Sequence, residues 1–260
     1  MSVMKSLLKI IYPLLSVALF AFGYYLLSLR LDSKIAAPQI DLIVKETGKI
    51  IAEKTFVKTV FSTLWRAVYG FMISLFIATI FAVIASAGET IEKLLYPLTL
   101  ISRAIPTMSI ILLCLIWLKA DKTPVAVSVV IVFPMLYSLL LSAIKSVNDD
   151  MKDVIRVYRV PKFKALVRYY IPSVFILAFS QLVTTLSFNI KLTISGEALA
   201  YTAGSIGVQM KLANGNFNTA NLLAWTIVSV LLGFAVELIL KALYKIGERV
   251  RYGYRNRKFN

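Results

Sequence analysis

The residue types that most often carry protein chemistry are scarce in this chain of 260 residues. It contains no histidine and one cysteine, Cys114, which lies in an apolar run and is expected to be a small buried residue. Metal sites built from histidine and cysteine, Cys–His nucleophile pairs and disulfide frameworks are therefore not expected. The segment 204–211 lacks the second glycine of an ATP-binding Gly-x-x-x-x-Gly-Lys-Ser/Thr loop, and no other segment supplies one. We predict a chain that is not an enzyme, with no catalytic residue and no metal site.

Charged residues inside long apolar runs are the remaining candidates for function. Each costs at least about 2.5–3.5 kcal/mol at the centre of a membrane helix. Arg103 lies close to Pro106, where a broken helix frees backbone groups, and Lys191 is followed by Ser195 and Glu197. We predict that these five residues line or gate a pathway. The alternative for each charge is a structural role, in which it pairs with a neighbour or reaches the membrane surface.

The elements that must position these residues are apolar helices. The chain is 59% hydrophobic and 16% charged, with a mean hydropathy of +0.79, whereas soluble domains are about 45–50% apolar and about 25% charged. Its apolar residues gather into runs close to the ~20 residues that a membrane helix needs. The sequence predicts an all-α polytopic membrane protein with about six transmembrane helices, over residues 7–29, 63–86, 94–118, 125–144, 171–194 and 221–244.

The distribution of basic residues predicts the orientation of these helices. Lysine and arginine concentrate on the side that carries both ends of the chain and the segment 146–170, and cytoplasmic loops are enriched in these residues. Both termini are therefore expected in the cytoplasm, and the formal charge of +16 requires no nucleic acid. Within the helices, Arg66 is expected to anchor at the outer interface and Glu237 to pair with Lys241 or with a neighbouring helix.

We divide the chain into three regions. Residues 1–62 form the first transmembrane helix and an external segment, whose residues Ile43, Ile50, Ile51, Phe56 and Val57 are typical of an amphipathic helix on the interface or against the bundle. Residues 63–246 form the core, with a cytoplasmic loop at 146–170. Residues 247–260 form a basic cytoplasmic tail.

The cytoplasmic loop 146–170 has the periodicity of two short amphipathic helices that meet at a corner. A first set of apolar residues ends at Tyr158, and Val160–Pro161 breaks the helix because proline restricts the residue before it and lacks a donor. A second set follows at the same i, i+3, i+4, i+7 spacing. Such basic helices suit either anionic lipid headgroups or a docking partner, and periodicity leaves both open. The two sets are Met151, Val154, Ile155 and Tyr158, and Phe163, Leu166, Val167 and Tyr170.

This loop resembles the signature of the membrane subunits of binding-protein-dependent ABC importers, which is Glu-Ala-Ala, a Gly three residues on, and a later Leu-Pro or Ile-Pro. Asp153 takes the place of the Glu, Val154 and Ile155 of the two Ala, and Ile171–Pro172 closes the motif. Arg159 replaces the usual Gly, so we expect Pro161, rather than a residue with positive φ, to set the corner.

Four other segments match the same family in order and spacing, and the resemblance covers residues 38–252. It is closest to the nitrate, sulfonate, taurine and pyrimidine-precursor branch. The matching segments are Thr63-Leu64-Trp65-Arg66 with Gly70-Phe71, Pro97 with 103–107 and Ile116-Trp117, Phe133-Pro134, and Lys191 with Ser195-Gly196-Glu197.

The resemblance implies the type I ABC importer permease fold, in which two permease copies, here a homodimer, form the translocation pathway in the bacterial inner membrane. It implies separate ABC ATPase subunits, which use ATP and Mg, and a periplasmic or lipid-anchored solute-binding protein; this chain itself needs no cofactor. The ATPase would bind the coupling loop through Asp153, Ile155, Tyr158, Arg159, Val160, Pro161, Lys162 and Phe163.

The resemblance also implies a small polar or anionic substrate, of the nitrate, sulfonate or taurine type or a thiamine precursor. The alternative function is that of a secondary transporter or channel, in which Arg103, Glu197 and Glu237 would be coupling or selectivity groups. The absence of a clear inverted repeat and the presence of the cytoplasmic corner argue against this alternative.

Overall fold

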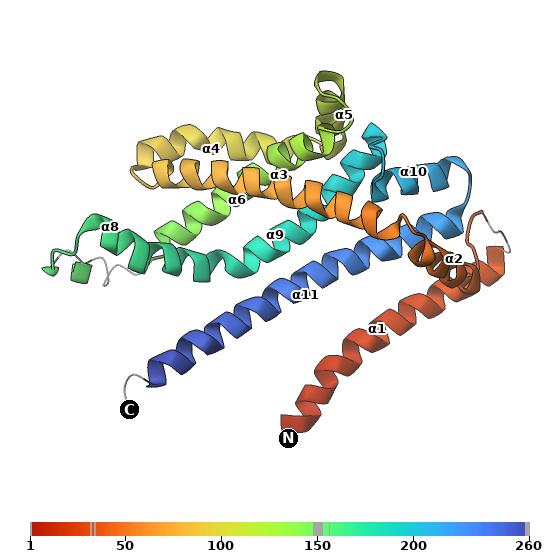
Figure 1. The fold of residues 1–260 in the computed structure, drawn as a ribbon, viewed down its shortest axis with the longest axis horizontal. Helices are drawn as coiled ribbons and strands as arrows, with labels where there is room; N and C mark the ends of the chain where they lie inside the picture. The colour runs from red at the N-terminus through yellow and green to blue at the C-terminus, as the bar shows by residue number, and fades with distance from the viewer. Residues whose placement is uncertain (1, 32, 34, 148–152, 156, 258–260) are drawn as a thin grey trace. The chain divides into compact units, whose positions relative to one another are not determined.

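The computed structural model describes residues 2–31, 33, 35–147, 153–155 and 157–257, with the side chains of 2–10, 13, 14, 17, 98, 101–103, 162 and 248–257 left out. All regular structure assigned in these residues is helical, as predicted (Figure 1). The helices are α1 (Ser2–Leu31), α2 (Ile40–Ala52), α3 (Phe56–Ala85), α4 (Glu89–Ala104), α5 (Thr107–Trp117), α6 (Thr123–Lys145), α8 (Lys162–Ala165), the π-helix η1 (Leu166–Tyr170), α9 (Ile171–Ala200), α10 (Ile206–Gly215) and α11 (Thr219–Arg257).

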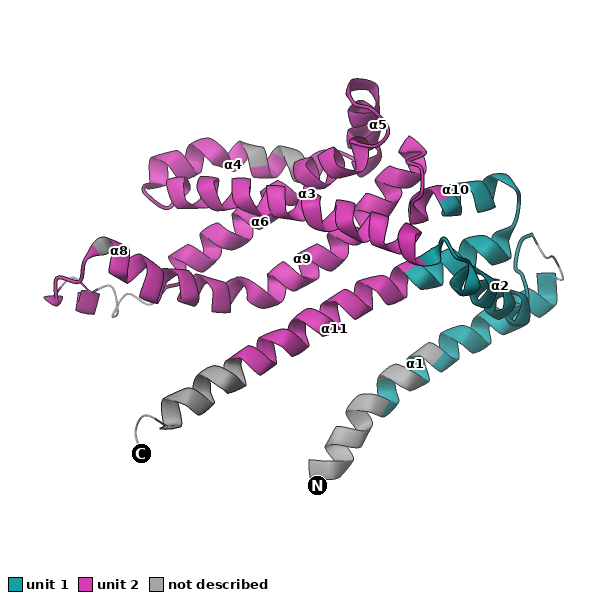
Figure 2. Cartoon of the chain, in the orientation of Figure 1, with its two compact units in different colours: residues 1–56, 209–228 teal, residues 57–208, 229–260 magenta. Residues whose placement is uncertain are grey.

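The chain divides into two compact units (Figure 2). The smaller unit comprises Met1–Phe56 and Gln209–Val228. Within it, α2 is the helix predicted from the amphipathic pattern, and its residues Ile43 and Ile50 are buried. The Glu46 carboxylate accepts a hydrogen bond from Lys49 at 2.6 Å, which lowers the pKa of that carboxyl. Phe56, predicted as part of the same amphipathic segment, instead begins α3.

The larger unit comprises Val57–Val208 and Ser229–Asn260, and its core lies among α3, α6 and α9. One face of α3 carries small buried residues at helical spacing, which lets neighbouring backbones approach closely. At Gly70 the approach is extreme, because a Cβ atom built there would lie 2.6 Å from the Cβ of Ser128 on α6. The small buried residues of α3 are Ala67, Gly70, Ser74, Ala78, Ala82 and Ala85.

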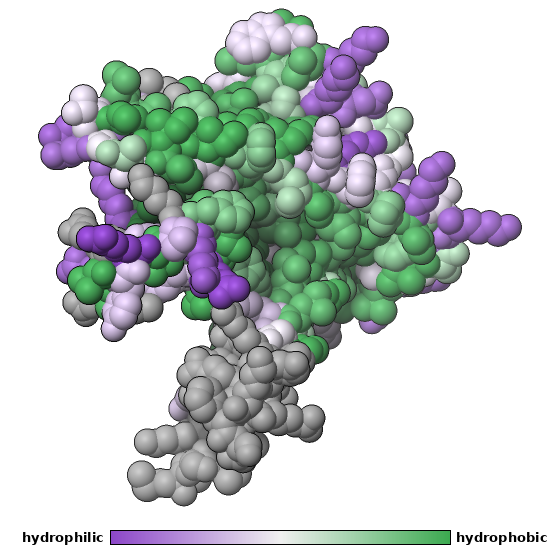
Figure 3. Space-filling view, turned by 60° about the vertical axis from the view of Figure 1, so that its left-hand side comes forward, coloured by the Kyte–Doolittle hydropathy of each residue, from purple (hydrophilic) through white to green (hydrophobic). Residues whose placement is uncertain are grey.

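Among the residues whose side chains the structure describes, four helices are long and apolar enough to cross a membrane: Phe56–Ala85, Thr123–Lys145, Phe163–Ala200 and Thr219–Gly247. The part of α1 over Ala18–Leu31 and the helix Thr107–Trp117 are shorter apolar segments. Large apolar side chains such as Phe76 and Leu94 are exposed on the protein surface, and Figure 3 shows a face composed mostly of hydrophobic residues. An apolar exterior of this kind suits contact with lipid rather than water.

The span predicted over residues 94–118 is divided into two helices, and the division lies at the break expected beside Pro106. The chain breaks between α4 and α5 at Pro106, whose ψ of 131° lies outside the helical range. Proline also disfavours helical geometry at the residue before it, here Ile105. Two other prolines, Pro97 in α4 and Pro134 in α6, are accommodated inside helices.

The fifth span was predicted from residue 171, where α9 begins, but helical structure starts earlier in the chain. The helix begins at Lys162 and continues through the π-turn η1 into α9, so the second short helix of the predicted corner is the end of a long one. Within this turn the Ile171 N–H bonds to the carbonyl of Leu166, five residues earlier. The wider turn precedes Pro172, which has no N–H to donate and whose ring would crowd the carbonyl of Arg168 in a regular α-helix.

Candidate coupling loop and buried carboxylate site

The corner of the coupling loop is a helix C-terminus closed by a left-handed residue. Residues 153–155 and 157 are helical, while 148–152 and 156, also part of the prediction, lie outside the described residues. The Val160 N–H bonds to the carbonyl of Ile155 at 3.0 Å, and between them Arg159 has a φ of +48°. A bond from the second residue past the helix to the third-last helical carbonyl, around a residue with positive φ, is the Schellman arrangement.

The expectation that Pro161 sets the corner in place of a residue with positive φ is therefore corrected. Arg159 adopts the left-handed conformation although it carries a Cβ, which costs about 1–2 kcal/mol. Pro161 has a different part: its carbonyl accepts the Ala165 N–H at 3.0 Å and so opens α8. The turn thus uses two residues, one to end the first helix and one to begin the next.

The predicted docking residues lie close together in sequence around this turn. Tyr158 and Phe163 are 77% and 78% exposed, which is unusual for aromatic side chains. Asp153, Arg159 and Pro161 are also exposed, and Ile155 and Val160 are half-buried. The side chain of Lys162 lies outside the described residues.

The buried carboxylate of Glu197 is the most completely hydrogen-bonded charged group described in the larger unit. Its side chain has no exposed surface. One oxygen accepts from Arg66 Nη1 at 3.1 Å, and the other accepts from the Thr63 hydroxyl at 2.9 Å and from the Gly207 N–H at 3.3 Å. Arg66, expected as an interface anchor, is instead the counter-ion of Glu197, which offsets the cost of burying a charge.

The same group of residues caps the N-terminus of α10. Its first three N–H groups, which lack partners within the helix, are satisfied in turn by Thr63 Oγ1 at 3.0 Å, the Glu197 carboxylate, and Ser205 Oγ at 3.1 Å. A negative charge at this position also complements the helix dipole. Gly207 is required here, since a Cβ atom would lie 2.3 Å from the carbonyl oxygen of Ile194.

The other predicted pathway residues do not join this cluster. Lys191 and Ser195 lie one turn apart on the exposed face of α9, and the Ser195 hydroxyl donates to the Lys191 carbonyl at 3.1 Å. Pro106 is exposed at the break between α4 and α5, and the side chain of Arg103 lies outside the described residues. Ser195 and Glu197 are thus on different faces of one helix.

Two structural expectations are met. Glu237 pairs with Lys241 one turn on, at 2.5 Å, and Cys114 is buried. Within the described residues, no group of three or more His, Cys, Asp and Glu side chains could hold a metal ion.

A row of buried polar residues that links the helices of the core was not predicted from the sequence. Asn189 donates to the carbonyl of Ala67 at 2.7 Å, and the hydroxyls of Ser128 and Thr193 lie 3.1 Å apart. The signal was present in α9, where Asn189, Thr193 and Glu197 recur every four residues and so share one face. Thr63 was predicted only as part of a family motif and not as a hydrogen-bond partner of Glu197.

Comparison with known protein families shows which family the chain belongs to. The family model of the binding-protein-dependent transport system inner membrane component matches residues 70–249. The chain belongs to this family. It is the membrane component of an ABC importer, it is non-catalytic, and such components work with a separate ATPase and a solute-binding protein. The secondary transporter and channel alternative is thereby set aside.

Solved structures agree on the fold. A crystal structure of an amino acid ABC transporter with histidines superposes with a TM-score of 0.59 at 14% identity, covering 75% of this chain and 93% of the other. An inward-facing conformation of the MetNI methionine ABC transporter superposes with a TM-score of 0.50 at 16% identity, and the match covers 80% of this chain and 98% of the other. At these identities the likeness shows the type I permease fold alone. No curated protein matches the chain.

Proposed function

We propose that this permease forms half of a translocation pathway and that its coupling loop is the surface to which the ATPase docks. The observation that carries the proposal is the corner at Arg159, a capped helix end with two exposed aromatic side chains, Tyr158 and Phe163, beside it. Exposed aromatic residues in a rigid turn are typical anchors for a protein groove. Asp153, Ile155, Val160, Pro161 and Lys162 would complete the docking surface.

The elements on either side of the corner suit the transmission of motion. α6 ends at Lys145, directly before the loop, and the helix that begins at Lys162 runs without interruption to Ala200. α6 and α9 pack closely against each other, so a displacement of the corner would tilt two joined helices rather than one. A rigid-body switch between two packed states is the expected response when the ATPases close on nucleotide.

We infer that the pathway is completed by a second copy of this chain, in a bacterial inner membrane with both termini in the cytoplasm. Lys191 and Ser195 are proposed to face the pathway together with Arg103 and Pro106, because they lie on the exposed side of their helices or at a helix break. Glu197 is proposed to act as part of the gate by holding α9, α10 and α3 together at one end of the pathway.

The proposed substrate is a small polar or anionic solute of the nitrate, sulfonate or taurine type, or a thiamine precursor. The basic side chains of Arg103 and Lys191 favour an anion, and a periplasmic or lipid-anchored binding protein would deliver it.

Co-purification tests the docking proposal. Replacing Arg159–Val160–Pro161 by Gly-Ser-Gly should abolish retention of the ATPase subunit, because it removes three side chains of the docking surface and the proline that opens α8, and leaves a flexible linker between the two exposed aromatic residues. The matched control is the same replacement at residues 86–88, in the turn between α3 and α4. The charge distribution predicts that this turn is also cytoplasmic, and the control variant should retain the ATPase. Retention by the corner variant would show that docking lies elsewhere.

A further inference from the structure

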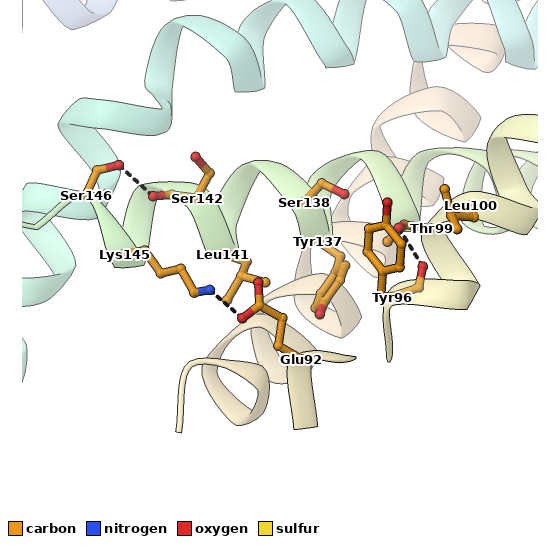
Figure 4. A pocket seen from close by; sticks show the side chains of 10 residues that line it. All are labelled: Glu92, Tyr96, Thr99, Leu100, Tyr137, Ser138, Leu141, Ser142, Lys145 and Ser146. Carbon is orange, nitrogen blue, oxygen red and sulfur yellow. Dashed lines mark hydrogen bonds and ion pairs between the residues drawn. The ribbon is translucent and has the colours of Figure 1, made fainter. Parts of the chain in front are cut away.

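A cavity of about 430 Å³ lies between α4 and α6, next to the start of the coupling loop. Its volume falls within the range of small-molecule sites, about 300–1,000 Å³. In Figure 4, residues of α4 face residues of α6 across it. The lining residues are Glu92, Tyr96, Thr99 and Leu100 from α4, and Tyr137, Ser138, Leu141, Ser142, Lys145 and Ser146 from α6 and the residue after it.

The hydroxyl of Tyr137 is the first indication of a ligand. The residue is 3% exposed, and among the described side chains its hydroxyl oxygen is one of two buried polar atoms without a hydrogen-bond partner. A buried unsatisfied group of this kind costs about 1–3 kcal/mol. Because Tyr137 lines the cavity, a bound molecule could supply the missing partner.

Three other polar groups of the cavity accept hydrogen bonds and so favour a ligand that donates them. Ser138 donates its hydroxyl proton to the carbonyl of Pro134 at 3.0 Å, and Ser146 donates to that of Ser142 at 2.8 Å. Each serine hydroxyl has one proton, so both oxygens present only lone pairs to the cavity. The carboxylate of Glu92 is an acceptor as well.

The charges and aromatic rings at the cavity favour a hydrogen-bond donor that is also a cation. Glu92 forms an ion pair with Lys145, and the side chains of these two residues are 30% and 51% exposed, respectively. Exposed pairs of this type contribute only about 0–1 kcal/mol, so a competing cation can displace the lysine into solvent at little cost. Two tyrosine rings, Tyr96 and Tyr137, line the same cavity, and aromatic faces attract cations.

We propose that this cavity is a binding site for a small organic ammonium group, held by the Glu92 carboxylate in place of Lys145 and by the Tyr137 hydroxyl. The site is distinct from the docking surface and holds whether or not the corner binds an ATPase. Since Lys145 and Ser146 connect α6 to the coupling loop, occupancy would change the packing at the base of that loop. The ammonium group could belong to a soluble amine or to a phosphatidylethanolamine headgroup.

The proposal is tested by calorimetric titration of the full-length protein in phosphatidylglycerol nanodiscs, with empty nanodiscs as the blank. Three ligands of similar size differ in charge: 2-phenylethylammonium, 2-phenylethanol and phenylacetate. We expect saturable binding of the ammonium compound alone. Equal or tighter binding of the alcohol or of the carboxylate would overturn the proposal.

Substitutions identify the groups involved. Glu92→Gln should weaken ammonium binding about tenfold or more, as expected for a lost charge-assisted hydrogen bond, and Tyr137→Phe should weaken it by a smaller factor. Lys145→Gln should tighten binding, because it removes the competing cation, whereas a site for anions would respond with the opposite sign. Glu89→Gln is the matched control, since Glu89 forms an exposed pair with Lys93 on the same helix and does not line the cavity. Equal effects of the two Glu→Gln changes would refute the site.

A second lipid composition separates the two sources of the ammonium group. If the lipid headgroup is the natural occupant, nanodiscs that contain phosphatidylethanolamine should weaken the apparent affinity for 2-phenylethylammonium by competition. If a soluble amine is the occupant, the affinity should be equal in both lipids. Either result supports an ammonium site and assigns its source.

Discussion

Replacing Thr63 by valine should be far more damaging than the loss of one hydroxyl group suggests. Valine keeps the shape of the side chain, yet this hydroxyl donates to the Glu197 carboxylate and accepts the Ile206 N–H, and Thr63 is fully buried. The charged bond contributes about 1.5–3 kcal/mol, and a neutral bond inside a membrane protein about 0.6–1.7 kcal/mol. We therefore expect Thr63→Val to lower the free energy of unfolding by about 2–5 kcal/mol.

The assay is reversible unfolding in mixed micelles with increasing sodium dodecyl sulfate. Thr79→Val is the matched control on the same helix, because Thr79 is exposed and donates to the backbone carbonyl of Leu75, one turn earlier. It should change the free energy of unfolding by less than about 0.5 kcal/mol. Equal stability of the two variants would show that the buried Thr63 hydroxyl contributes no more than an exposed one.

A double-mutant cycle with Glu197→Gln extends this test to the buried carboxylate. If Thr63 and Glu197 act as one unit, their effects on the unfolding free energy should be non-additive by about 1 kcal/mol or more. Additive effects would mean that the hydrogen bond between them contributes nothing to stability.

Three further predictions concern other parts of the chain. Arg159→Gly should stabilise the chain by about 1 kcal/mol in the same unfolding assay and retain the ATPase, because glycine adopts positive φ without steric cost; a loss of stability would contradict the left-handed turn. Gly207→Ala should destabilise the protein strongly, whereas Gly215→Ala, with open space around it, should be stable; equal unfolding midpoints would show that the close approach to α9 is absent. In a cysteine-free background, Ser195→Cys should react with a membrane-impermeant maleimide if this face of α9 lines the pathway, whereas the fully buried Ile190→Cys should not; protection of both would exclude an aqueous pathway at that face.

Features that depend on local sequence could be predicted well. Long apolar runs predicted the positions of α3, α6, α9 and α11, and the spacing of Ile43 and Ile50 predicted the buried face of α2. The corner was predicted from periodicity and from Pro161. Its geometry was not, because the conformation of Arg159 depends on a hydrogen bond that outweighs the preference of a side chain with a Cβ.

Features that depend on distant residues could not be predicted. The partners of Glu197 on α3 lie 131 and 134 positions away in the sequence, and no local pattern brings them together. The break at Pro106 was predicted, but Pro97 and Pro134 lie inside helices, so proline alone does not distinguish a break from a kink. The lack of a hydrogen-bond partner for the Tyr137 hydroxyl could not be predicted either, because it depends on how α4 packs against α6.

The π-turn at 166–170 has a consequence for the tolerance of this region to insertions and deletions. A regular α-helix advances about 100° per residue, and a π-turn accommodates one residue more than the same α-helical turn. The wide turn therefore absorbs one residue without rotating the helical segments on either side of it. Deleting a single residue there would leave the corner facing the same way, but the regular turn would bring the ring of Pro172 against the carbonyl one turn earlier. We expect the shortened turn to be tolerated only when Pro172 is replaced as well, so the extra residue and the proline should be gained or lost together.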